Sequence, residues 1–441
     1  MTQNTIKDLG DGLIIRHGSD ADTQALAQFN KAIHGEDEWD GKGVQEWTLD
    51  LVEGKCPTVS ARDFTIVEDT HKNEIVSSCC HISQTWAYEG IFFKVGRPEL
   101  VGTRESYRRR GLVRQQFEIL HQWSKERGEL VQAITGIPYY YRQFGYEMTL
   151  NLGGGRVGYE INVPNLKEGE IEPFLFRPAA MEDLPLLMAA YARGCQRSMV
   201  YAVRDETLWR YEVAQQRKYN INRRDLFIIE SINGAAVGFI ALPPIKWGDM
   251  SALTLYEITE EASWAEITPS VIRFLWQRGE ALAKEQNQTQ KTFGFWLGES
   301  HPAYHVAASM LARVRSPYAY YIRVADLLAF LRLIKPALER RLSQSAFAHY
   351  TGNLKLSFYR GGIALNIQNG EIIEIKPLSF KELGDAHAAF PPLTHLHLIF
   401  GHRSMTELQH AFADCTTKND ETRNLLDSLF PKRPSEIWVI S

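Results

Sequence analysis

The spacing of apolar residues changes repeatedly along residues 1–170 and predicts strands that alternate with helices. Two short alternating runs, residues 64–67 and 75–82, predict an antiparallel hairpin, and a further strand is predicted to end at Thr103. The helix expected after it carries an apolar stripe at helical spacing: Leu112, Val113, Phe117, Leu120 and Trp123. A short buried strand over 130–134 follows. This order of elements predicts a unit of the mixed α/β class.

The same pattern occurs twice in the chain. The stretches "LIIRHGSDAD" from Leu13 and "FLFRPAAMED" from Phe174 each contain three apolar residues, then Arg, then Asp six positions later. Further along, "RDFTIVED" and "RDLFIIES" match at nearly the same offset. Because two matches at one spacing carry more weight than either alone, we expect a duplicated α/β unit over 1–170 and 171–325.

Residues 326–441 have a different pattern. An amphipathic helix over 325–342 precedes two runs of alternating apolar and polar residues. Asn369-Gly370 is a dipeptide typical of a two-residue hairpin turn. This region therefore predicts a third, smaller α+β domain.

Composition and charge exclude several classes of protein. The 441 residues carry a formal net charge of -4, so a general affinity for nucleic acid is not expected. Five cysteines are too few and too scattered for a disulfide framework, and they fit a reducing cytoplasm. No apolar stretch is long enough to cross a membrane, and the opening residues do not show the pattern of a secretion signal. We expect a cytoplasmic protein without a nucleic-acid or membrane partner.

An unusual run of arginines lies in the stretch "GTRESYRRRGLVRQQF". Arg108, Arg109 and Arg110 directly precede Gly111, where a helix is predicted to begin. A helix N-terminus offers unsatisfied backbone N–H groups and a positive dipole end, and both favour an anion. Glycine allows close approach of the backbone, and guanidinium groups bind phosphate through paired donors. The pattern favours a pyrophosphate site. A solvated arginine cluster at an ordinary helix start is the alternative.

Two motifs together resemble a known family. Arg108-x-x-Gly111-x-Val113 resembles the Q/R-x-x-G-x-G/A loop that binds acetyl-coenzyme A in the GNAT N-acetyltransferases, with valine in place of the last small residue. The stretch "YYRQFGYE", from Tyr140 to Glu147, resembles the Y-x-x-F-G-F/Y turn of the same enzymes. Strand, loop and turn follow one another in the family's order and spacing, so residues 1–150 are similar to a GNAT catalytic domain.

The resemblance implies acetyl-coenzyme A as the cosubstrate. A strand would pair with the pantetheine arm, the arginine loop would hold the pyrophosphate, and the end of the next strand would flank the other side. The residues implied for these contacts are Val101, Gly102, Thr103, Arg108, Arg109, Arg110, Gly111, Leu112, Val113, Arg114, Gly136 and Ile137.

The resemblance also implies a general acid. Tyr141, four residues before Gly145, falls where these enzymes keep a tyrosine. Attack by an amine expels a thiolate, and a phenol of pKa about 10 can protonate a thiolate whose acid has a pKa of about 8.5. Tyr139 and Tyr140 are nearby rivals, and the alternative is a core aromatic residue. The oxyanion formed during transfer would meet backbone N–H groups of the strand.

An acidic run lies between the first helices of the chain, which are predicted from the helical spacing of Leu26, Phe29 and Ile33 onward, and such enzymes often bind the acceptor there. Glu36, Asp37 and Glu38 could attract a cationic amine, and Trp39 and Trp47 could offer stacking surfaces. A solvated loop is the alternative.

Two groups of histidines are candidates for metal ligands. His395 and His397 are predicted on one face of a strand, with His402 near, but no cysteine or carboxylate completes a set at metal-ligand spacing. His301 and His305 lie four residues apart without the glutamate expected of a hydrolytic zinc helix. We expect no metal.

The second copy of the unit keeps the fold pattern without the chemistry. The stretch matching the arginine loop reads "ITPSVIRFLWQRGEAL", with Thr268 predicted as a helix cap and Pro269 as the first helical residue. No glycine opens the backbone and no arginine cluster remains. Tyr304 lies near the position of Tyr141, but no F-G-Y sequence follows it. This copy is expected not to bind coenzyme A.

The whole chain resembles the enhanced-intracellular-survival (Eis-like) acetyltransferases. That resemblance implies a catalytic GNAT domain over 1–170, a degenerate GNAT domain over 171–325 and a sterol-carrier-like domain over 326–441. It implies a homo-oligomer, since members are often hexamers. It also implies that the terminal carboxylate, here that of Ser441, is the general base, and a frayed terminus is the alternative.

The sequence thus favours an N-acetyltransferase that acts on a primary amine of a small cationic compound, such as an aminoglycoside or a polyamine. The alternative is a non-catalytic protein, either a coenzyme A sensor or a lipid carrier working through the third domain. The retained Tyr141 favours the enzyme, because a sensor needs no proton donor.

Overall fold

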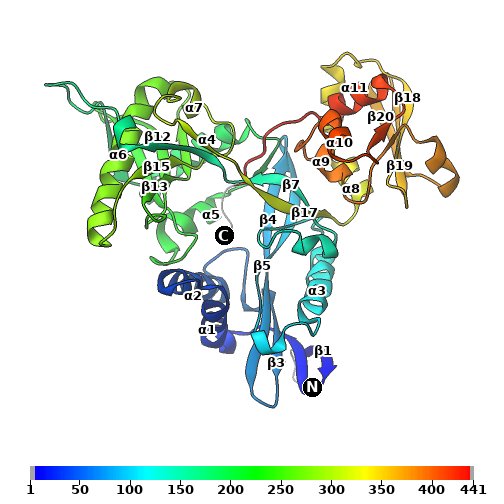
Figure 1. The fold of residues 1–441 in the computed structure, drawn as a ribbon, viewed down its shortest axis with the longest axis horizontal. Coiled ribbons are helices and arrows are strands. Elements are labelled where there is room, and N and C mark those ends of the chain that lie inside the picture. The colour runs from blue at the N-terminus through cyan, green and yellow to red at the C-terminus, as the bar shows by residue number, and fades with distance from the viewer. Residues whose placement is uncertain (1–4, 438–441) are drawn as a thin grey trace.

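The computed structural model describes residues 5–437, and in this part of the chain the strands form one nine-stranded, two four-stranded and one five-stranded sheet. Figure 1 shows three lobes, with the first unit in the middle, the second on the left and the third on the right. The mixed α/β class predicted from the sequence is confirmed.

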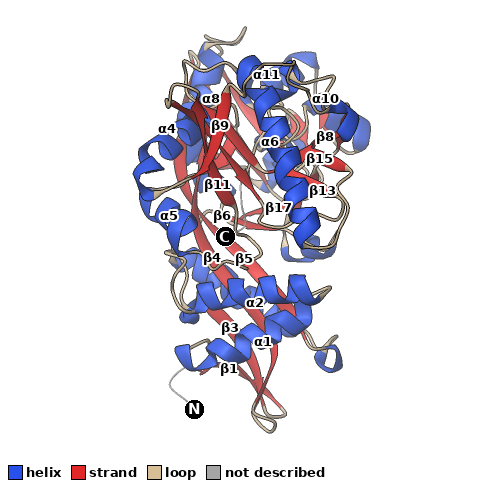
Figure 2. Ribbon diagram, turned by 90° about the vertical axis from the view of Figure 1, so that its left-hand side faces the viewer, coloured by secondary structure: helices blue, strands red, loops and turns tan. Residues whose placement is uncertain are grey.

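The first unit contains the predicted strands and helices. Their bounds are β1 (Thr5–Gly10), β2 (Leu13–His17), α1 (Thr23–His34), α2 (Glu38–Val52), β3 (Phe64–Asp69), β4 (Glu74–Tyr88), β5 (Ile91–Thr103), α3 (Leu112–Glu126), β6 (Val131–Ile134) and β7 (Glu147–Leu152). The expected hairpin is β3 and β4, with Phe64 opposite Cys80. Helices α1 and α2 cover one face of this sheet (Figure 2), and α3 packs on the other.

The first sheet is split in its middle, where strand β5 pairs fully with β4 but only briefly with β6. Its pairing with β4 shifts between Glu99 and Gly102, because Leu100 adopts a left-handed backbone with φ of 50°. On its other side β5 pairs with β6 only at Val95 and Gly96. Beyond Gly96 the two parallel strands therefore diverge, and one edge of β5 is left facing the gap.

The second unit also alternates strands and helices. Its elements are β9 (Phe174–Pro178), α4 (Leu184–Cys195), β10 (Val200–Ala202), α5 (Glu206–Arg210), β11 (Asp225–Ser231), β12 (Ala236–Leu242), β13 (Met250–Leu253), β14 (Leu255–Ile258), α6 (Trp264–Glu285), β15 (Thr292–Phe295), α7 (Ala303–Val306) and β16 (Arg313–Arg315). Strand β10 lies between its first two helices, and two short strands, β13 and β14, come before its long helix.

The repeated Arg–Asp pattern makes the same contact in both units. Arg16 donates to both carboxylate oxygens of Asp22, at 2.8 and 2.7 Å, and to a glutamate of β3. Arg177 donates to both oxygens of Asp183, at 2.7 and 2.8 Å, and to a glutamate of β11. Such paired, charge-assisted bonds fix the first strand of each unit against the start of the helix that follows.

Helix α6 begins earlier than the sequence predicts. Ser263 is its N-cap and accepts a hydrogen bond from the backbone N–H of Glu266 at 3.4 Å, so the prediction of Thr268 as the cap is wrong. Pro269 lies inside the helix. Trp264 and Ile267 pack into the core of the second unit, and this burial outweighs the helix bond that proline cannot make.

The first two units exchange strands. Strand β8 (Gly155–Tyr159) follows β7 in sequence but lies between β15 and β16 of the second unit. Strand β17 (Tyr318–Val324) lies between β6 and β7 of the first unit, and β10 pairs with β4. The positions 170 and 325, where we placed the domain boundaries, each follow a strand that has crossed to the other unit.

The third unit packs directly on the first. It consists of α8 (Leu327–Ser343), β18 (Gly352–Ser357), β19 (Gly362–Gln368), β20 (Glu371–Pro377), β21 (Ala388–Ala389), α9 (His395–Ile399), α10 (Met405–Ala411), β22 (Thr416–Thr417) and α11 (Asp420–Leu429). Asn369 and Gly370, with φ of 49° and 83°, form the predicted turn between β19 and β20. Tyr88 and Phe93 of the first unit share one buried core with Phe330 and Phe400 of the third.

The histidines of the third unit do not lie on a strand, so that prediction is wrong. His395 and His397 belong to α9, which packs against β7. A five-residue run of alternating type fits a buried helical turn as well as a strand, and its packing decides between them.

Candidate active site

The arginine loop forms an exposed, positively charged helix start. Gly111 is the N-cap of α3 and has φ of 74°, and a Cβ placed on it would meet no atom within 4 Å. Arg108, Arg109 and Arg110 are exposed, and within residues 5–437 neither they nor Arg114 forms an ion pair with a carboxylate. Four unneutralised guanidinium groups beside free helix N–H groups favour a multiply charged anion.

Three of these arginines are held by neutral groups instead, and the first of them, Arg108, donates to the carbonyl of Thr103 at 3.3 Å. Arg110 lies 5.5 Å from the ring centre of Tyr107, and Arg114 donates to the side chain of Gln143 at 2.7 Å. These contacts orient the guanidinium groups without cancelling their charge. Leu112 is buried, so at that position only the backbone N–H can face a ligand.

The predicted strand residues lie beside this loop. Gly102 and Thr103 pair with β4, and the opposite edge of β5 faces the gap described above. Gly136 follows β6 on the far side of the gap, and its carbonyl accepts a hydrogen bond from Tyr318 of β17 at 3.0 Å. Ile137 is exposed next to it. An extended, amide-containing chain could therefore pair with the free strand edge.

Tyr141 lies at the inner end of this gap. It belongs to a short 3-10 helix, η4 (Tyr140–Phe144), and its ring packs against Phe117 and Tyr321 at 5.8 and 5.5 Å between centres. A Cβ on Gly136 would lie 3.5 Å from the Tyr141 hydroxyl. Burial, and after it the charge of Glu99, raise the pKa of Tyr141, so the phenol keeps its proton at neutral pH.

The two rival tyrosines differ from Tyr141 in position. Tyr139 is 71% exposed, and Tyr140 packs edge-on against Tyr141 and Phe144, with 5.1 and 5.8 Å between the ring centres. Of the three, Tyr141 is the one whose hydroxyl the structure brings to the end of β6.

A carboxyl group that the sequence analysis missed lies near Tyr141. Glu99 is on β5, two residues before Val101, and is ion-paired with Arg97, whose side chain is fully buried. Burial raises the pKa of Glu99 to about 7, although Arg97 acts in the opposite direction. The sequence does carry a signal, since a charged pair two residues apart on a buried strand needs an explanation.

In the acidic run at the start of α2, one residue caps the helix and the others are exposed without a structural contact of this kind. Asp37 caps α2 by accepting from the N–H of Asp40 at 2.9 Å, while Glu36 and Glu38 are exposed. Trp39 is 55% exposed and lies 6.2 Å from the ring of a tyrosine of the second unit. Burial, together with Asp37 and Glu36, raises the pKa of Asp40.

The interpretation of Trp47 as a stacking surface is wrong. Trp47 is 5% exposed and packs in the core between α1 and α2. Helical spacing places it on the buried face of α2, whereas Trp39 lies on the open face.

The C-terminal segment enters a cavity between the first two units. Its residues 434–436 pair with residues 199–201, which include the first two residues of β10, and Ile437 is buried. A cavity of about 140 Å³ is lined by this segment and by residues of both units, among them Leu152, Trp247 and Trp296. Ser441, the predicted base, lies outside the described residues.

No cluster of three or more histidine, cysteine or acidic side chains in residues 5–437 has the arrangement of a metal site. His397 and His402 are joined through their Nδ1 atoms at 3.0 Å. Burial lowers the pKa of His397 to about 3 and that of His402 to about 4, so both rings are neutral at physiological pH. Across the same described range, no helix is long and apolar enough to cross a membrane.

The first unit matches a family model. Residues 15–149 match the family described as acetyltransferase (GNAT) domain. A search of curated protein sequences finds no match. The family match covers β2 to β7, including the arginine loop and η4.

Several solved structures share the fold over nearly the whole chain. A GCN5-related N-acetyltransferase from Anabaena variabilis has a TM-score of 0.66 at 13% identity, covering 96% of this chain and 99% of that one. A probable N-acyltransferase from Enterococcus faecalis has a TM-score of 0.66 at 12% identity, covering 97% and 100%. Eis1 from Mycobacterium abscessus has a TM-score of 0.61 at 12% identity, covering 97% and 100%. At these identities the likeness establishes the fold.

Proposed function

We propose that this protein, an N-acetyltransferase by virtue of its GNAT domain, acetylates a primary amine of a small cationic compound such as an aminoglycoside or a polyamine. The observation that carries the proposal is the group of arginines around Gly111 that pair with no carboxylate in residues 5–437, beside an edge of β5 that faces a gap near a buried, neutral Tyr141. This combination suits a long phosphorylated thioester better than a simple anion, because charge, strand edge and proton donor follow one another along a single gap.

GNAT domains use acetyl-coenzyme A, which supplies the acetyl group as a thioester. In the proposal Arg108, Arg109, Arg110 and Arg114 bind the pyrophosphate together with the N–H groups that begin α3. The edge of β5 over Val101–Thr103 pairs with the pantetheine arm, and Gly136 and Ile137 flank it from the side of β6.

Proton transfer is assigned to two groups beside the gap. Tyr141 keeps its proton until a thiolate leaves, and it then donates that proton. Glu99, with a pKa near 7, accepts the proton that the amine must lose. The Ser441 carboxylate is the alternative acceptor that the family resemblance implies.

Glu99→Gln separates these two acceptors. Because the ionised carboxylate is the active form, kcat/KM of the native enzyme is expected to rise with pH through about 7 and to level off above it. In Glu99→Gln the rise disappears and the plateau rate falls by about 100-fold. Steady-state kinetics across this pH range measure both effects, with Glu118→Gln on the exposed face of α3 as the control.

Extending the chain beyond Ser441 tests the alternative. If the terminal carboxylate is the base, an added residue lowers kcat by about 100-fold without weakening cofactor binding. An extended protein with native turnover and an intact pH profile would assign the proton to Glu99.

The acceptor side is assigned to the acidic start of α2 and to the cavity between the first two units. Glu36, Asp37, Glu38 and Trp39 would attract and orient a cation, since carboxylates and an exposed aromatic ring both favour positive charge. Asp37 would act mainly through its charge, because one of its oxygens already caps α2.

The remaining units are proposed to support this site. The second unit is a degenerate GNAT domain, because at the place of the arginine loop α6 begins with Trp264 and has no glycine N-cap. The third unit is sterol-carrier-like. Its shared core with the first unit argues against a mobile lipid carrier. A cytoplasmic homo-oligomer is part of the proposal, and light scattering measures the oligomeric state.

Thiol release from acetyl-coenzyme A tests the function. The intact protein is incubated with a panel of polyamines and aminoglycosides, and free thiol and acetylated amine are measured together. We expect release with at least one amine and stoichiometric acetylation. Coenzyme A binding without acetyl transfer to any amine would favour the sensor instead.

A further inference from the structure

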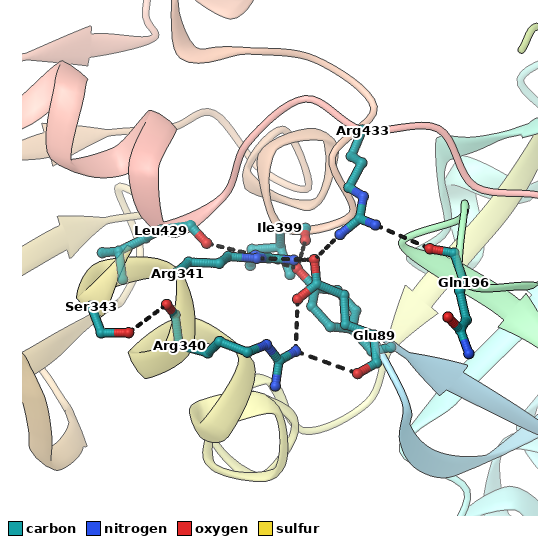
Figure 3. Close-up of polar contacts among 9 residues, drawn as sticks. Glu89, Gln196, Arg340, Arg341, Ser343, Ile399, Leu429 and Arg433 are labelled. Atoms are coloured by element: carbon teal, nitrogen blue, oxygen red, sulfur yellow. Dashed lines mark hydrogen bonds and ion pairs between the residues drawn. The ribbon is translucent and has the colours of Figure 1, made fainter. Parts of the chain in front are cut away.

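A single carboxylate holds three arginines at the tip of the β4–β5 hairpin. Glu89 forms the turn together with Gly90, with φ of 46° and 86°. Its side chain is 8% exposed and contacts Arg340 at 3.0 Å, Arg341 at 2.9 Å and Arg433 at 2.6 Å. Figure 3 shows the three guanidinium groups converging on Glu89 from two sides. Burial would raise the pKa of Glu89, but the three arginines more than offset it and keep the group ionised.

The arginines belong to different parts of the chain. Arg340 and Arg341 lie in the last turn of α8, and Arg433 lies in the C-terminal segment. Arg341 also donates to the carbonyl of Leu429 at 2.6 Å, and Arg433 donates to the carbonyl of Gln196 at 3.2 Å. The junction therefore joins all three units through one side chain (Figure 3).

Residues 434–437 lead from Arg433 to the wall of the cavity between the first two units. Met199 N–H donates to the carbonyl of Pro434 at 2.8 Å, and Glu436 N–H donates to the carbonyl of Val200 at 3.1 Å. Ser435, Glu436 and Ile437 then form part of the cavity wall. This short pairing begins at Pro434, the residue directly after the arginine that Glu89 holds.

Three arginines around one carboxylate leave an excess of positive charge. If the carboxylate became neutral, the guanidinium groups would repel one another at a partly buried site. Arg340 and Arg341 are fixed in α8, whereas Arg433 lies outside any helix or strand, and the segment around it is held by single backbone bonds such as that from its own N–H to the carbonyl of Gly401 at 2.9 Å. The C-terminal segment is therefore the part expected to move away.

We propose that Glu89 is a positioning residue: it seats the C-terminal segment, residues 431–437, against β10, so that the third unit braces the wall of the acceptor cavity. The catalytic consequence rests on the proposed function, whereas the seating of the segment does not. The third unit then serves the acetyltransferase as a fixed support for the chain that leads into the cavity.

Hydrogen exchange tests the seating without any substrate. In Glu89→Gln the amides of Met199 and Glu436 are expected to exchange about tenfold faster or more, because a buried charge pair has lost its partner. The amide of Val203, which bonds to Thr85 of β4 at 2.8 Å, should keep its native rate. Glu206→Gln removes an exposed glutamate that also pairs with an arginine, and it is the matched control.

A second variant distinguishes release of the C-terminal segment from a general loss of stability. Arg433→Met leaves Glu89 with the two arginines of α8 and should speed exchange at the same two amides. The double variant Glu89→Gln/Arg433→Met should be no faster than the faster single variant, since both changes release the same segment. Native exchange rates in Glu89→Gln, or an equal acceleration at Val203, would overturn the proposal.

The kinetic arm measures acetyl transfer. In Glu89→Gln kcat is expected to fall about fivefold to tenfold with unchanged affinity for acetyl-coenzyme A, because the bound cofactor is not touched and only the cavity wall is misplaced. Faster exchange with native kcat would refute the catalytic half of the proposal. If the native protein transfers acetyl to no amine, the proposed function fails, and the exchange experiment still decides the seating.

Discussion

Replacing Tyr141 by phenylalanine is expected to lower kcat by about 100-fold or more while leaving the affinity for acetyl-coenzyme A unchanged, since general acid catalysis contributes about 10²–10⁴-fold. The ring would keep its packing on Phe117 and Tyr321, so the fold should not change. Burial and the charge of Glu99 hold the phenol in its protonated form, and phenylalanine has no proton to give. Steady-state assays of thiol release measure kcat, and calorimetric titration with coenzyme A measures the cofactor affinity.

Two neighbouring tyrosines provide the controls for this prediction. Tyr139→Phe and Tyr140→Phe each remove a hydroxyl from the same segment, whereas it is the Tyr141 hydroxyl that lies next to Gly136 at the end of β6. We expect each to retain at least about a third of native kcat. A larger loss in either control than in Tyr141→Phe would move the proton donor to that residue.

Charge reversal in the arginine loop is expected to weaken coenzyme A binding by about 100-fold or more, since hydrogen bonds to charged groups contribute about 1.5–3 kcal/mol each. Arg109→Glu/Arg110→Glu replaces two attractive charges by two repulsive ones beside the N-terminus of α3. Because neither arginine pairs with a carboxylate in residues 5–437, the melting temperature should change little. Calorimetric titration and a thermal melt test both parts.

Salt dependence and a distant arginine sharpen the test of the loop. Arg360→Glu reverses one charge at an exposed position of the third unit and should leave the affinity for coenzyme A unchanged. Native binding should weaken as salt is raised, and the double variant should lose most of that dependence. If the double variant binds coenzyme A as the native protein does, the pyrophosphate does not lie at the start of α3, and the assignment of the loop is wrong.

The sequence predicted most of the local structure of the first unit. Apolar spacing located the β3–β4 hairpin and α3, because each is built from neighbours in the chain whose burial follows a simple period. The Arg–Asp repeat was found as a pattern, and the structure explains it as the same paired contact at Arg16 and Arg177. The turn at Asn369-Gly370 was equally predictable, since few dipeptides adopt two positive φ angles.

The sequence was weaker where a short run fits two structures. His395 and His397 alternate with leucine as in a strand, yet contact with β7 makes the run a helix. Thr268 and Pro269 show a good cap signal inside a longer helix, and the packing of Trp264 extends α6 past it. In both cases burial against a distant element, which no local pattern contains, outweighed local preference.

By itself the sequence determined the charge of the arginine loop, the glycine that begins α3 and the tyrosine turn, because each consists of neighbouring residues whose chemistry is independent of the rest of the chain. Only the tertiary structure decided that β8 joins a sheet of the second unit and β17 the sheet of the first. It also decided that Glu99 lies close enough to Tyr141 to affect the pKa of that tyrosine. The contact of Glu89 with Arg340, Arg341 and Arg433 is a third relation of this kind. These relations join residues up to hundreds of positions apart. They depend on which strand edges and which buried charges lie next to one another in the folded protein, and local sequence patterns do not contain this information.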